Sequence, residues 1–431
     1  MLIIVVVFVI SFLIGIPVAF SMGISGIVGL LFAANSAPNM AAIKMYTSLD
    51  SFALLAIPLY GIMGYIMEKS GALARLTNFL KTILGPIKGG MAYLNVLASM
   101  MFAGISGTAV SDVSSMGFLE IKMMKETGLP QDFSGALTAA SAVAGPIIPP
   151  SLAMVVFALA IGGGISISGL FASGVIPGIL LGLFLILVSY IYMHRKGVSE
   201  KIISDSKPSI KQVLHVTWSA LPVLFLPFII IGGILSGIFT VTEAAAVGII
   251  YSLFVGFFIT KELKISHLPL IILGAASITG SIAIIFGASS LISWILTINQ
   301  IPVIIANAIM SVTTSRYVFL LLVVALMLLV GCVMEPNAAL IMLAPILYPI
   351  AVQLGIHPFQ FGLIFVMTVE IGLLTPPVGV LLFVTSSVGE IELSKLIKMI
   401  WPFFIAEVLV VILAIFIPQI TLFIPTVFGY C

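Results

Sequence analysis

Charged side chains are scarce in this sequence. Asp, Glu, Lys and Arg together make up 7% of its 431 residues, whereas a soluble domain usually contains about 25%. Hydrophobic residues account for 61%, and many of them stand in runs long enough to cross a bilayer. The chain cannot hide so much apolar surface from water. We therefore expect an all-α polytopic membrane protein whose surroundings are the lipid bilayer.

The residues of common catalytic and metal sites are also few. The two cysteines, Cys332 and Cys431, imply no disulfide framework. The four histidines stand at the edges of apolar segments, and none forms an HExxH or similar ligand spacing. An intramembrane enzyme would need His, Cys or paired Asp residues at membrane depth. The net charge of +2 gives no basis for nucleic-acid binding. We expect no enzyme and no nucleic-acid partner.

Glycine and proline interrupt the apolar sequence at four places. One pair of interruptions lies at 104–112 (GISGTAVSD) and 144–151 (AGPIIPPS), and the other at 331–339 (GCVMEPNAA) and 371–378 (IGLLTPPV). A backbone N–H or C=O group that lacks a hydrogen bond at membrane depth costs on the order of several kcal/mol. Such a break is tolerated where it lines a cavity or binds a ligand. Breaks at corresponding positions of two halves point to a transporter's binding site.

The two pairs of breaks belong to an internal repeat. At a constant offset of 227 positions, seven glycines and prolines coincide, and few other residues match. The shared feature is therefore backbone conformation, which glycine and proline control. The coincident pairs are Gly104 and Gly331, Gly128 and Gly355, Gly135 and Gly362, Gly145 and Gly372, Pro149 and Pro376, Pro150 and Pro377, and Gly162 and Gly389.

The repeat and the polar stretches predict a division of the chain. The first half is residues 1–193, with a re-entrant hairpin at 91–119 and a broken span at 134–163. A cytoplasmic linker follows at 194–215. The second half is residues 216–431, with a hairpin at 317–350 and a broken span at 359–389. Basic residues collect on the cytoplasmic side. Lys88 and Lys122 flank the first hairpin, whereas the second has only Arg316. We expect the hairpins to enter from opposite sides, so that the halves are inverted.

The remaining segments complete the expected topology. Residues 2–33 read as one apolar stretch in which Pro17 marks a kink or a join. Residues 35–51 read as a polar connection, and 400–426 as the last crossing. Amphipathic periodicity at 72–90 predicts a helix lying in the membrane interface, with 299–315 as its counterpart.

Helix ends inside a membrane can bind ions of both signs. A half-helix N-terminus favours an anion such as a carboxylate, and the free carbonyls of a half-helix C-terminus favour a hard cation such as Na⁺. The pattern predicts two pseudo-symmetric cation sites, each between a hairpin tip and a broken span. Hydroxyls there could equally bond helix carbonyls one turn back. The candidates are Ser106, Thr108, Ser111, Gly145, Ile148 and Pro149 in the first half, and Gly331, Asn337, Gly372, Thr375, Pro376 and Gly379 in the second.

Carboxylates at membrane depth are hypotheses for the transport pathway. They are Asp112, Glu243, Glu335, Glu370 and Glu407. Asp112 and Glu335 stand at hairpin tips and are the better candidates. Glu243 follows Thr240 by three residues, which favours a capping box. For Glu370 and Glu407, protonation and pairing with a neighbour stay open. No arginine falls in the broken segments, so an anionic substrate would be bound by backbone N–H groups, hydroxyls and amides.

Four stretches give the chain a resemblance to a known family. They are FAGISGTAVSDVSSMG (102–117), GLPQDFSGALTAASAVAGPIIPPS (128–151), GIFTVTEAAAVG (237–248) and EIGLLTPPVG (370–379). With them the chain resembles the large membrane subunit of tripartite ATP-independent periplasmic (TRAP) transporters. The resemblance implies inverted repeats, an elevator-type movement, and Na⁺-driven uptake of an organic acid such as sialic acid or a C4-dicarboxylate. It also implies the bacterial inner membrane, a periplasmic substrate-binding protein and a small membrane subunit on a separate chain.

The same resemblance implies the positions of the sites. One sodium ion would lie near Ser106, Gly145, Ile148 and Pro149, and the other near Gly331, Thr375, Pro376 and Gly379. The substrate would lie between the hairpin tips, near Thr108, Ser111, Asp112, Ser151 and Asn337. A di- or tricarboxylate symporter of the same hairpin fold, which needs no binding protein, is the main alternative. A channel is a third possibility, although hairpins that close on a central site favour alternating access.

Overall fold

The computed structural model describes residues 2–32, 39–106, 108–196, 208–376 and 378–431. These residues form helices and connecting loops, with no β-strand in the described ranges. Eight of the helices are long and apolar enough to cross a membrane, and one bent helix pair would make a ninth span. The prediction of an all-α polytopic membrane protein is confirmed.

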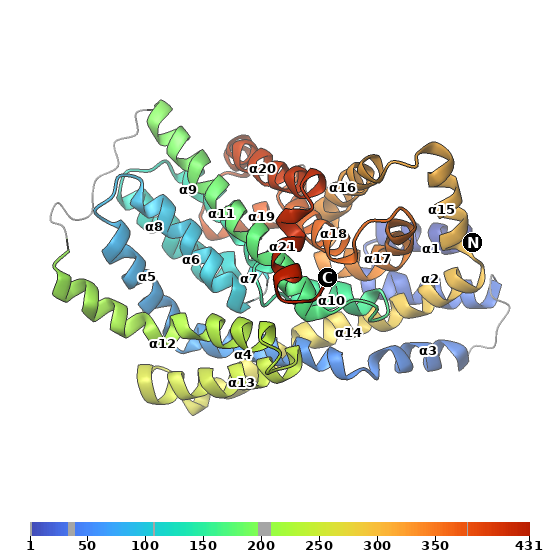
Figure 1. The fold of residues 1–431 in the computed structure, drawn as a ribbon, viewed down its shortest axis with the longest axis horizontal. Helices are drawn as coiled ribbons and strands as arrows, with labels where there is room; N and C mark the ends of the chain where they lie inside the picture. The colour runs from blue at the N-terminus through green and yellow to red at the C-terminus, as the bar shows by residue number, and fades with distance from the viewer. Residues whose placement is uncertain (1, 33–38, 107, 197–207, 377) are drawn as a thin grey trace.

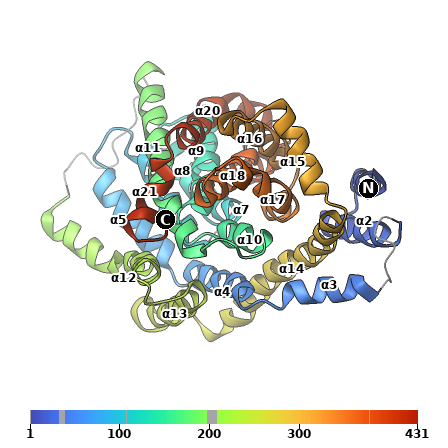
Figure 2. The same ribbon diagram turned by 45° about the vertical axis from the view of Figure 1, so that its right-hand side comes forward.

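The helices fall into two groups. Most of the outer helices run along the lower side of the elongated molecule in Figure 1, and the inner helices lie above them (Figures 1 and 2). The outer helices are α1 (Leu2–Leu13), α2 (Val18–Phe32), α3 (Asn39–Leu49), α4 (Ala56–Lys69), α5 (Ala72–Leu84), α12 (Ile210–Leu235), α13 (Val241–Phe254), α14 (Leu268–Ile298) and α15 (Ile301–Val312).

The inner helices contain both hairpins and both broken spans. They are α6 (Gly90–Ser106), α7 (Ala109–Asp112), α8 (Phe118–Glu126), α9 (Gln131–Val143), α10 (Leu152–Ala160), α11 (Ile167–Lys196), α16 (Arg316–Val333), α17 (Pro336–Gln353), α18 (Pro358–Gly372), α19 (Val380–Val388), α20 (Leu393–Phe416) and α21 (Gln419–Val427). A π-helical segment, Val113–Gly117, joins α7 to α8 without a break.

The offset of 227 reappears in the helix bounds. Adding 227 to 109–126, the residues from the start of α7 to the end of α8, gives 336–353, the bounds of α17. The same addition takes the start of α9 to the start of α18 and the end of α6 to the end of α16. The repeat inferred from glycine and proline is thus a repeat of helix lengths. The inverted orientation of the halves stays a prediction.

The two sets of inner helices are interlocked. α10, the second part of the first broken span, packs against α17 of the second hairpin. In turn α19 packs against the π-helical segment of the first hairpin, where Gly117 lies beside Val388. Each broken span is therefore supported by the hairpin of the other repeat.

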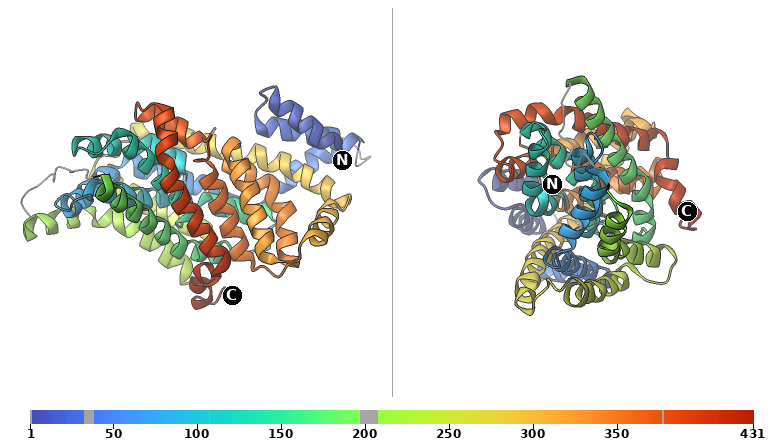
Figure 3. Two further views of the ribbon diagram at one scale, coloured as in Figure 1. Left: turned by 90° about the horizontal axis from the view of Figure 1, so that it is seen from above. Right: turned by 90° about the vertical axis from the view of Figure 1, so that its left-hand side faces the viewer.

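The predicted join at Pro17 is confirmed: one helix ends at Leu13 and the next begins at Val18. Helix α2 packs on α1, with Ile4 against Gly29. With 12 and 15 residues, each is shorter than the roughly 20 residues of a spanning helix. Figure 3 shows this pair at one end of the molecule. Residues 39–49, within the predicted polar connection, form α3.

Corrections also apply to the second half and the linker. The last candidate span is α20 alone, which ends at Phe416, and α21 is a separate short helix after a break at Ile417–Pro418. α12 begins at Ile210, inside the predicted linker, because Ser209 and Gln212 form a capping box there. Residues 197–207 of that linker lie outside the described residues. Both hairpins are longer than predicted and extend to Glu126 and Gln353.

The predicted amphipathic helix is present as α5. Leu76 and Leu80 are buried on the face toward α6 and α12, whereas Ile83 is 39% exposed. Its counterpart is α15. That these two helices lie in the membrane interface stays a prediction.

Candidate functional site

The tip of the first hairpin lies between α6 and α7. Thr108 is the N-cap of α7, and its side-chain oxygen accepts a hydrogen bond of 3.3 Å from the backbone N–H of Ser111. Both residues are half-buried. The predicted ligand Ser106 ends α6, but its side chain lies outside the part of the chain that the structure describes. Thr108 and Ser111 therefore stand together at this tip, as the sequence predicts.

The first broken span changes direction between α9 and α10, which are bent by 50°. A 3₁₀ turn at Gly145–Ile147 ends α9, and Ile148 is extended. Among the described residues, the carbonyl oxygens of Ile148 and Pro149 accept no hydrogen bond. Two prolines supply no N–H group here, so the chain cannot continue as a helix. The break therefore leaves the carbonyl oxygens of Ile148 and Pro149 available to coordinate a ligand.

Ser151 fixes the far side of this break. Its hydroxyl oxygen accepts a hydrogen bond of 3.1 Å from the backbone N–H of Met154, and its proton goes to the carbonyl oxygen of Pro146. Ser151 is fully buried and is the N-cap of α10. Its observed contacts are those of a helix cap. Whether it also contacts a substrate stays a prediction.

The second broken span meets the tip of the second hairpin through Cys332. The Cys332 thiol lies 3.0 Å from the carbonyl oxygen of Thr375, and the N–H of Gly379 donates to the Cys332 carbonyl at 3.2 Å. Gly379 has a φ of +47°, which glycine adopts readily. The structure therefore brings together Gly331, Thr375 and Gly379, three residues of the predicted second cation site. Pro376 follows Thr375, and Pro377 lies outside the described residues.

Two side chains near this tip have buried polar atoms without partners. Within the part of the chain that the structure describes, the Thr375 hydroxyl oxygen makes no hydrogen bond, and neither does the Oδ1 of Asn337. The Asn337 amide nitrogen donates to Glu335, which caps α17 by accepting from the N–H of Ala338 at 3.0 Å. Since unpartnered buried polar atoms are uncommon in folded proteins, the Thr375 and Asn337 oxygens are suitable ligand contacts.

The remaining carboxylates have different surroundings. Glu243 is exposed and forms the predicted capping box: its N–H donates to Thr240 at 3.3 Å, and its carboxylate accepts from the Thr240 N–H at 2.8 Å. Glu370 is buried and in electrostatic contact with Glu335. Glu407 is 1% exposed, and its Oε2 has no partner. The capping role of Glu243 is confirmed.

Sequence reasoning missed a group of polar residues below the first tip. Glu120, which lies one residue beyond the predicted hairpin, is 1% exposed because α9 covers the longer α8. Asn95 of α6 is fully buried and donates to Glu120 at 2.7 Å. Asn95 stands in an apolar run, and this isolated amide was the sequence signal that could have indicated a buried polar group. Lys122 and Lys125, close to Glu120, had suggested water-exposed surroundings.

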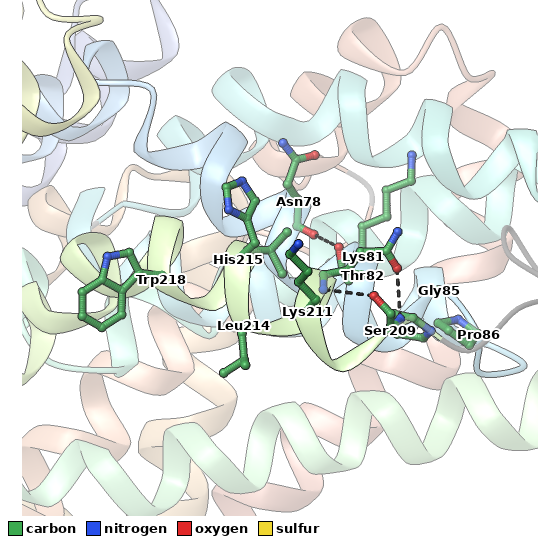
Figure 4. A pocket seen from close by; sticks show the side chains of 13 residues that line it. Asn78, Lys81, Thr82, Gly85, Pro86, Ser209, Lys211, Leu214, His215 and Trp218 are labelled. Carbon is green, nitrogen blue, oxygen red and sulfur yellow. Dashed lines mark hydrogen bonds between the residues drawn. The ribbon is translucent and has the colours of Figure 1, made fainter.

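One cavity lies away from the hairpin tips. It measures about 1080 Å³ and lies between α5 and α12, with Lys81, Lys211 and His215 in its lining. Figure 4 shows these side chains around it. A second cavity of about 360 Å³ is lined by Ser48 and Ser289, among others, between the outer and inner helices. None of the predicted site residues lines either cavity.

Clusters suited to zinc or iron do not occur in the described ranges, where no three His, Cys, Asp or Glu side chains come together. The donors at the two breaks are carbonyl, hydroxyl and amide oxygens. Such oxygens suit hard cations, whereas zinc prefers thiolate and imidazole ligands.

Comparison with known proteins agrees with this arrangement. Residues 4–420 match the family described as "Tripartite ATP-independent periplasmic transporter, DctM component". The C4-dicarboxylate TRAP transporter large permease protein DctM of Pseudomonas aeruginosa is 38% identical over 409 residues, 95% of this chain and 94% of that protein. The sialic acid TRAP transporter large permease protein SiaM of Vibrio cholerae is 35% identical over 417 residues, 96% of each.

A solved structure shares the fold. The YdaH transporter of Alcanivorax borkumensis superposes with a TM-score of 0.62 at 15% sequence identity, covering 90% of this chain and 86% of that one. The named relatives are permeases, which places this chain among transporters rather than intramembrane enzymes. The chain therefore belongs to the DctM family and is a multi-pass large membrane component of a TRAP transporter.

Proposed function

We propose that this chain mediates sodium-coupled uptake of a small organic acid across the bacterial inner membrane. The observation that carries the proposal is a set of oxygens at both breaks that have no hydrogen-bond partner among the described residues. They are the carbonyl oxygens of Ile148 and Pro149 in the first break and the Thr375 hydroxyl oxygen in the second. Oxygen donors of this kind, exposed where a helix is interrupted at membrane depth, are suited to Na⁺.

Two sodium ions would bind, one at each break. The first would use Gly145, Ile148 and Pro149 together with Ser106 of the hairpin tip. The second would use Thr375 and its neighbour Pro376, with Gly331 and Gly379 close by through Cys332. Each ion would join a hairpin tip to a broken span. Sodium binding would thereby fix the relative positions of the elements that surround the substrate.

The substrate would be a carboxylate bound between the tips. The relatives named for C4-dicarboxylates and sialic acid support this class. Thr108, Ser111, Ser151 and Asn337 supply neutral hydroxyl and amide groups, and the N-termini of α7, α10 and α17 add partial positive charge. Asn337 is the strongest candidate, because its Oδ1 is buried without a partner.

The arrangement of the helices supports an elevator-type movement. The inner helices, which contain the hairpins and broken spans, would move as one body against the outer helices. Interlocking of α10 with α17, and of α19 with the π-helical segment, would keep the two repeats together during that movement. The inner helices would move across the membrane when they hold both sodium and substrate, and also when they are empty. They would not move with sodium alone, since that movement would dissipate the sodium gradient without transporting substrate.

The tripartite family description supports two protein partners. One is a small membrane subunit on a separate chain, and the other is a periplasmic substrate-binding protein. The deciding experiment reconstitutes this chain with its small subunit in liposomes. Labelled sialic acid and labelled succinate are offered with and without a sodium gradient and the cognate binding protein.

The expected result is uptake of one acid that needs both sodium and the binding protein. Uptake that is the same with and without the binding protein would instead support the symporter alternative. Uptake that needs the binding protein but does not depend on the sodium gradient would contradict the two proposed sodium sites. Large single-channel currents would overturn alternating access.

A further inference from the structure

Six polar side chains form a buried cluster inside the first repeat, below the hairpin tip. All are at most 1% exposed, and they come from α6, α7, α8 and α9. Four helices thus enclose a group of oxygen and nitrogen atoms that is shielded from solvent. We call it the hairpin cluster, and its members are Asn95, Ser99, Asp112, Glu120, Thr138 and Ser141.

Hydrogen bonds organise one side of the hairpin cluster. The Asn95 amide nitrogen donates to Glu120 Oε2 at 2.7 Å and to Thr138 Oγ1 at 2.9 Å. The Ser141 hydroxyl lies 3.0 Å from Asn95 Oδ1 and 3.0 Å from the Ser99 hydroxyl. These contacts fix the Asn95 amide and one carboxylate oxygen. They use only neutral donors, so they do not compensate the charge of Glu120.

The other side of the hairpin cluster has three carboxylate oxygens without partners. They are both oxygens of Asp112 and Oε1 of Glu120. The two carboxylates are in electrostatic contact, and the Ser99 hydroxyl faces Asp112 without forming a hydrogen bond of good geometry. Among the described residues, no Lys, Arg or His forms an ion pair with either one. Two buried carboxylates that repel each other need either a proton or a cation to remove the uncompensated charge.

The π-helical segment brings the two carboxylates to the same side of the hairpin. In an α-helix, residues eight positions apart differ by about 80° around the axis. A π-helix has about 4.4 residues per turn, so its five residues here remove about 90° from that difference. The segment Val113–Gly117 lies between Asp112 and Glu120 and turns both to nearly the same face. π-helical turns of this kind often occur at functional sites.

The corresponding positions of the second repeat lack these features. Adding 227 to 112 and 120 gives Ala339 and Leu347, which are both buried and apolar. They stand on α17, which runs from Pro336 to Gln353 as an uninterrupted α-helix. The fold therefore does not require carboxylates or a π-helical segment at these positions. Their presence in the first repeat alone indicates a role beyond folding.

We infer that the hairpin cluster is an additional monovalent-cation site, in which Asp112 and Glu120 are the charged ligands and Ser99 a neutral one. One cation between the carboxylates would engage all three partnerless oxygens, whereas a shared proton could engage two. Calcium takes about six to eight oxygen ligands, more than this closed cluster offers. The inference rests on the proposed use of sodium. It gives Asp112 a cation as its partner instead of the substrate.

The test counts bound sodium. The chain is purified with its small subunit in nanodiscs, and radioactive ²²Na⁺ binding is titrated to saturation in choline buffer. Asp112→Asn and Glu120→Gln keep the shape of the side chain but remove its charge, and each should bind one ion fewer per chain than the wild type. Glu407→Gln is the matched control. It is another carboxylate at 1% exposure with a partnerless oxygen, and its ion count should stay at the wild-type value.

A second measurement uses the wild-type protein and does not depend on the folding of a variant. Sodium should slow amide hydrogen exchange in residues 109–126 relative to potassium or choline. Unchanged ion counts in both variants, unchanged exchange in this segment, or displacement of the ion by micromolar calcium would each overturn the site. A wild-type protein that binds no sodium at all would instead overturn the proposed sodium coupling.

Discussion

Gly331 of α16 and Gly372 of α18 lie backbone to backbone where the second hairpin crosses the second broken span. A Cβ atom added to Gly372 would lie 2.7 Å from the Cα of Gly331, and one added to Gly331 would lie 2.6 Å from the carbonyl oxygen of Val369. Both approaches are too short for a side chain. This crossing places the Cys332 thiol against the Thr375 carbonyl, so the second candidate cation site depends on it.

Gly331→Ala should therefore impair both folding and transport. The atoms in the way are backbone atoms that cannot rotate aside, and overpacking of this kind costs about 1–3 kcal/mol. We expect a lower Tm and strongly reduced uptake. Gly280→Ala on α14 is the control, because nothing lies within 4 Å of its added Cβ. That variant should match or exceed wild-type stability, and equal behaviour of the two variants would contradict the close crossing.

Thr375→Ala should weaken the sodium dependence of uptake more than it weakens expression. The Thr375 hydroxyl oxygen is buried without a partner, so its removal takes a ligand from the ion but no hydrogen bond from the fold. We expect the sodium concentration for half-maximal uptake to rise about tenfold, which corresponds to about 1.4 kcal/mol.

Thr385→Ala provides the comparison for that measurement. Thr385 is a buried threonine on α19 whose hydroxyl donates to the Leu381 carbonyl at 2.7 Å. Its loss should leave the sodium dependence unchanged. If Thr375→Ala behaves in the same way, Thr375 does not belong to the cation site.

Pro149→Ala should reduce transport by restoring an N–H group at the break. An alanine at this position permits the turn at Gly145–Ile147 to continue toward α10, whereas proline prevents it. We expect slower hydrogen exchange over residues 145–151 and lower uptake. Pro177→Ala is the matched control, since Pro177 is buried inside the continuous helix α11. Wild-type uptake by Pro149→Ala would argue against a functional break.

Glu243→Ala should destabilise the protein without changing its transport. The Glu243 carboxylate accepts from the Thr240 N–H and hydroxyl, each at 2.8 Å, in the capping box of α13. Loss of such a cap leaves N–H groups at the start of the helix without their partner and lowers the stability of the fold. We expect a lower Tm with an unchanged sodium concentration for half-maximal uptake. A changed sodium dependence would show that Glu243 takes part in coupling.

The sequence alone determined the positions of the backbone breaks. Proline lacks an N–H group and glycine adopts conformations closed to other residues, so both act locally wherever they stand. This is why Pro149 and Pro376 located the broken spans, and why an offset of 227 recovered the repeat before any helix was placed. The capping box of Thr240 and Glu243 was predictable for the same reason, since both partners lie within one turn.

The tertiary structure decided which polar groups are buried and which segments meet. Glu120 is closely followed by Lys122 and Lys125 in the sequence, and only the packing of α9 over α8 removes it from water. The π-helical segment that turns Asp112 toward Glu120 has no signature in residue type. Cys332 and Thr375 are 43 positions apart, and their contact requires α16 and α18 to cross at two glycines. Burial and long-range contact depend on the whole chain, whereas backbone breaks depend on single residues.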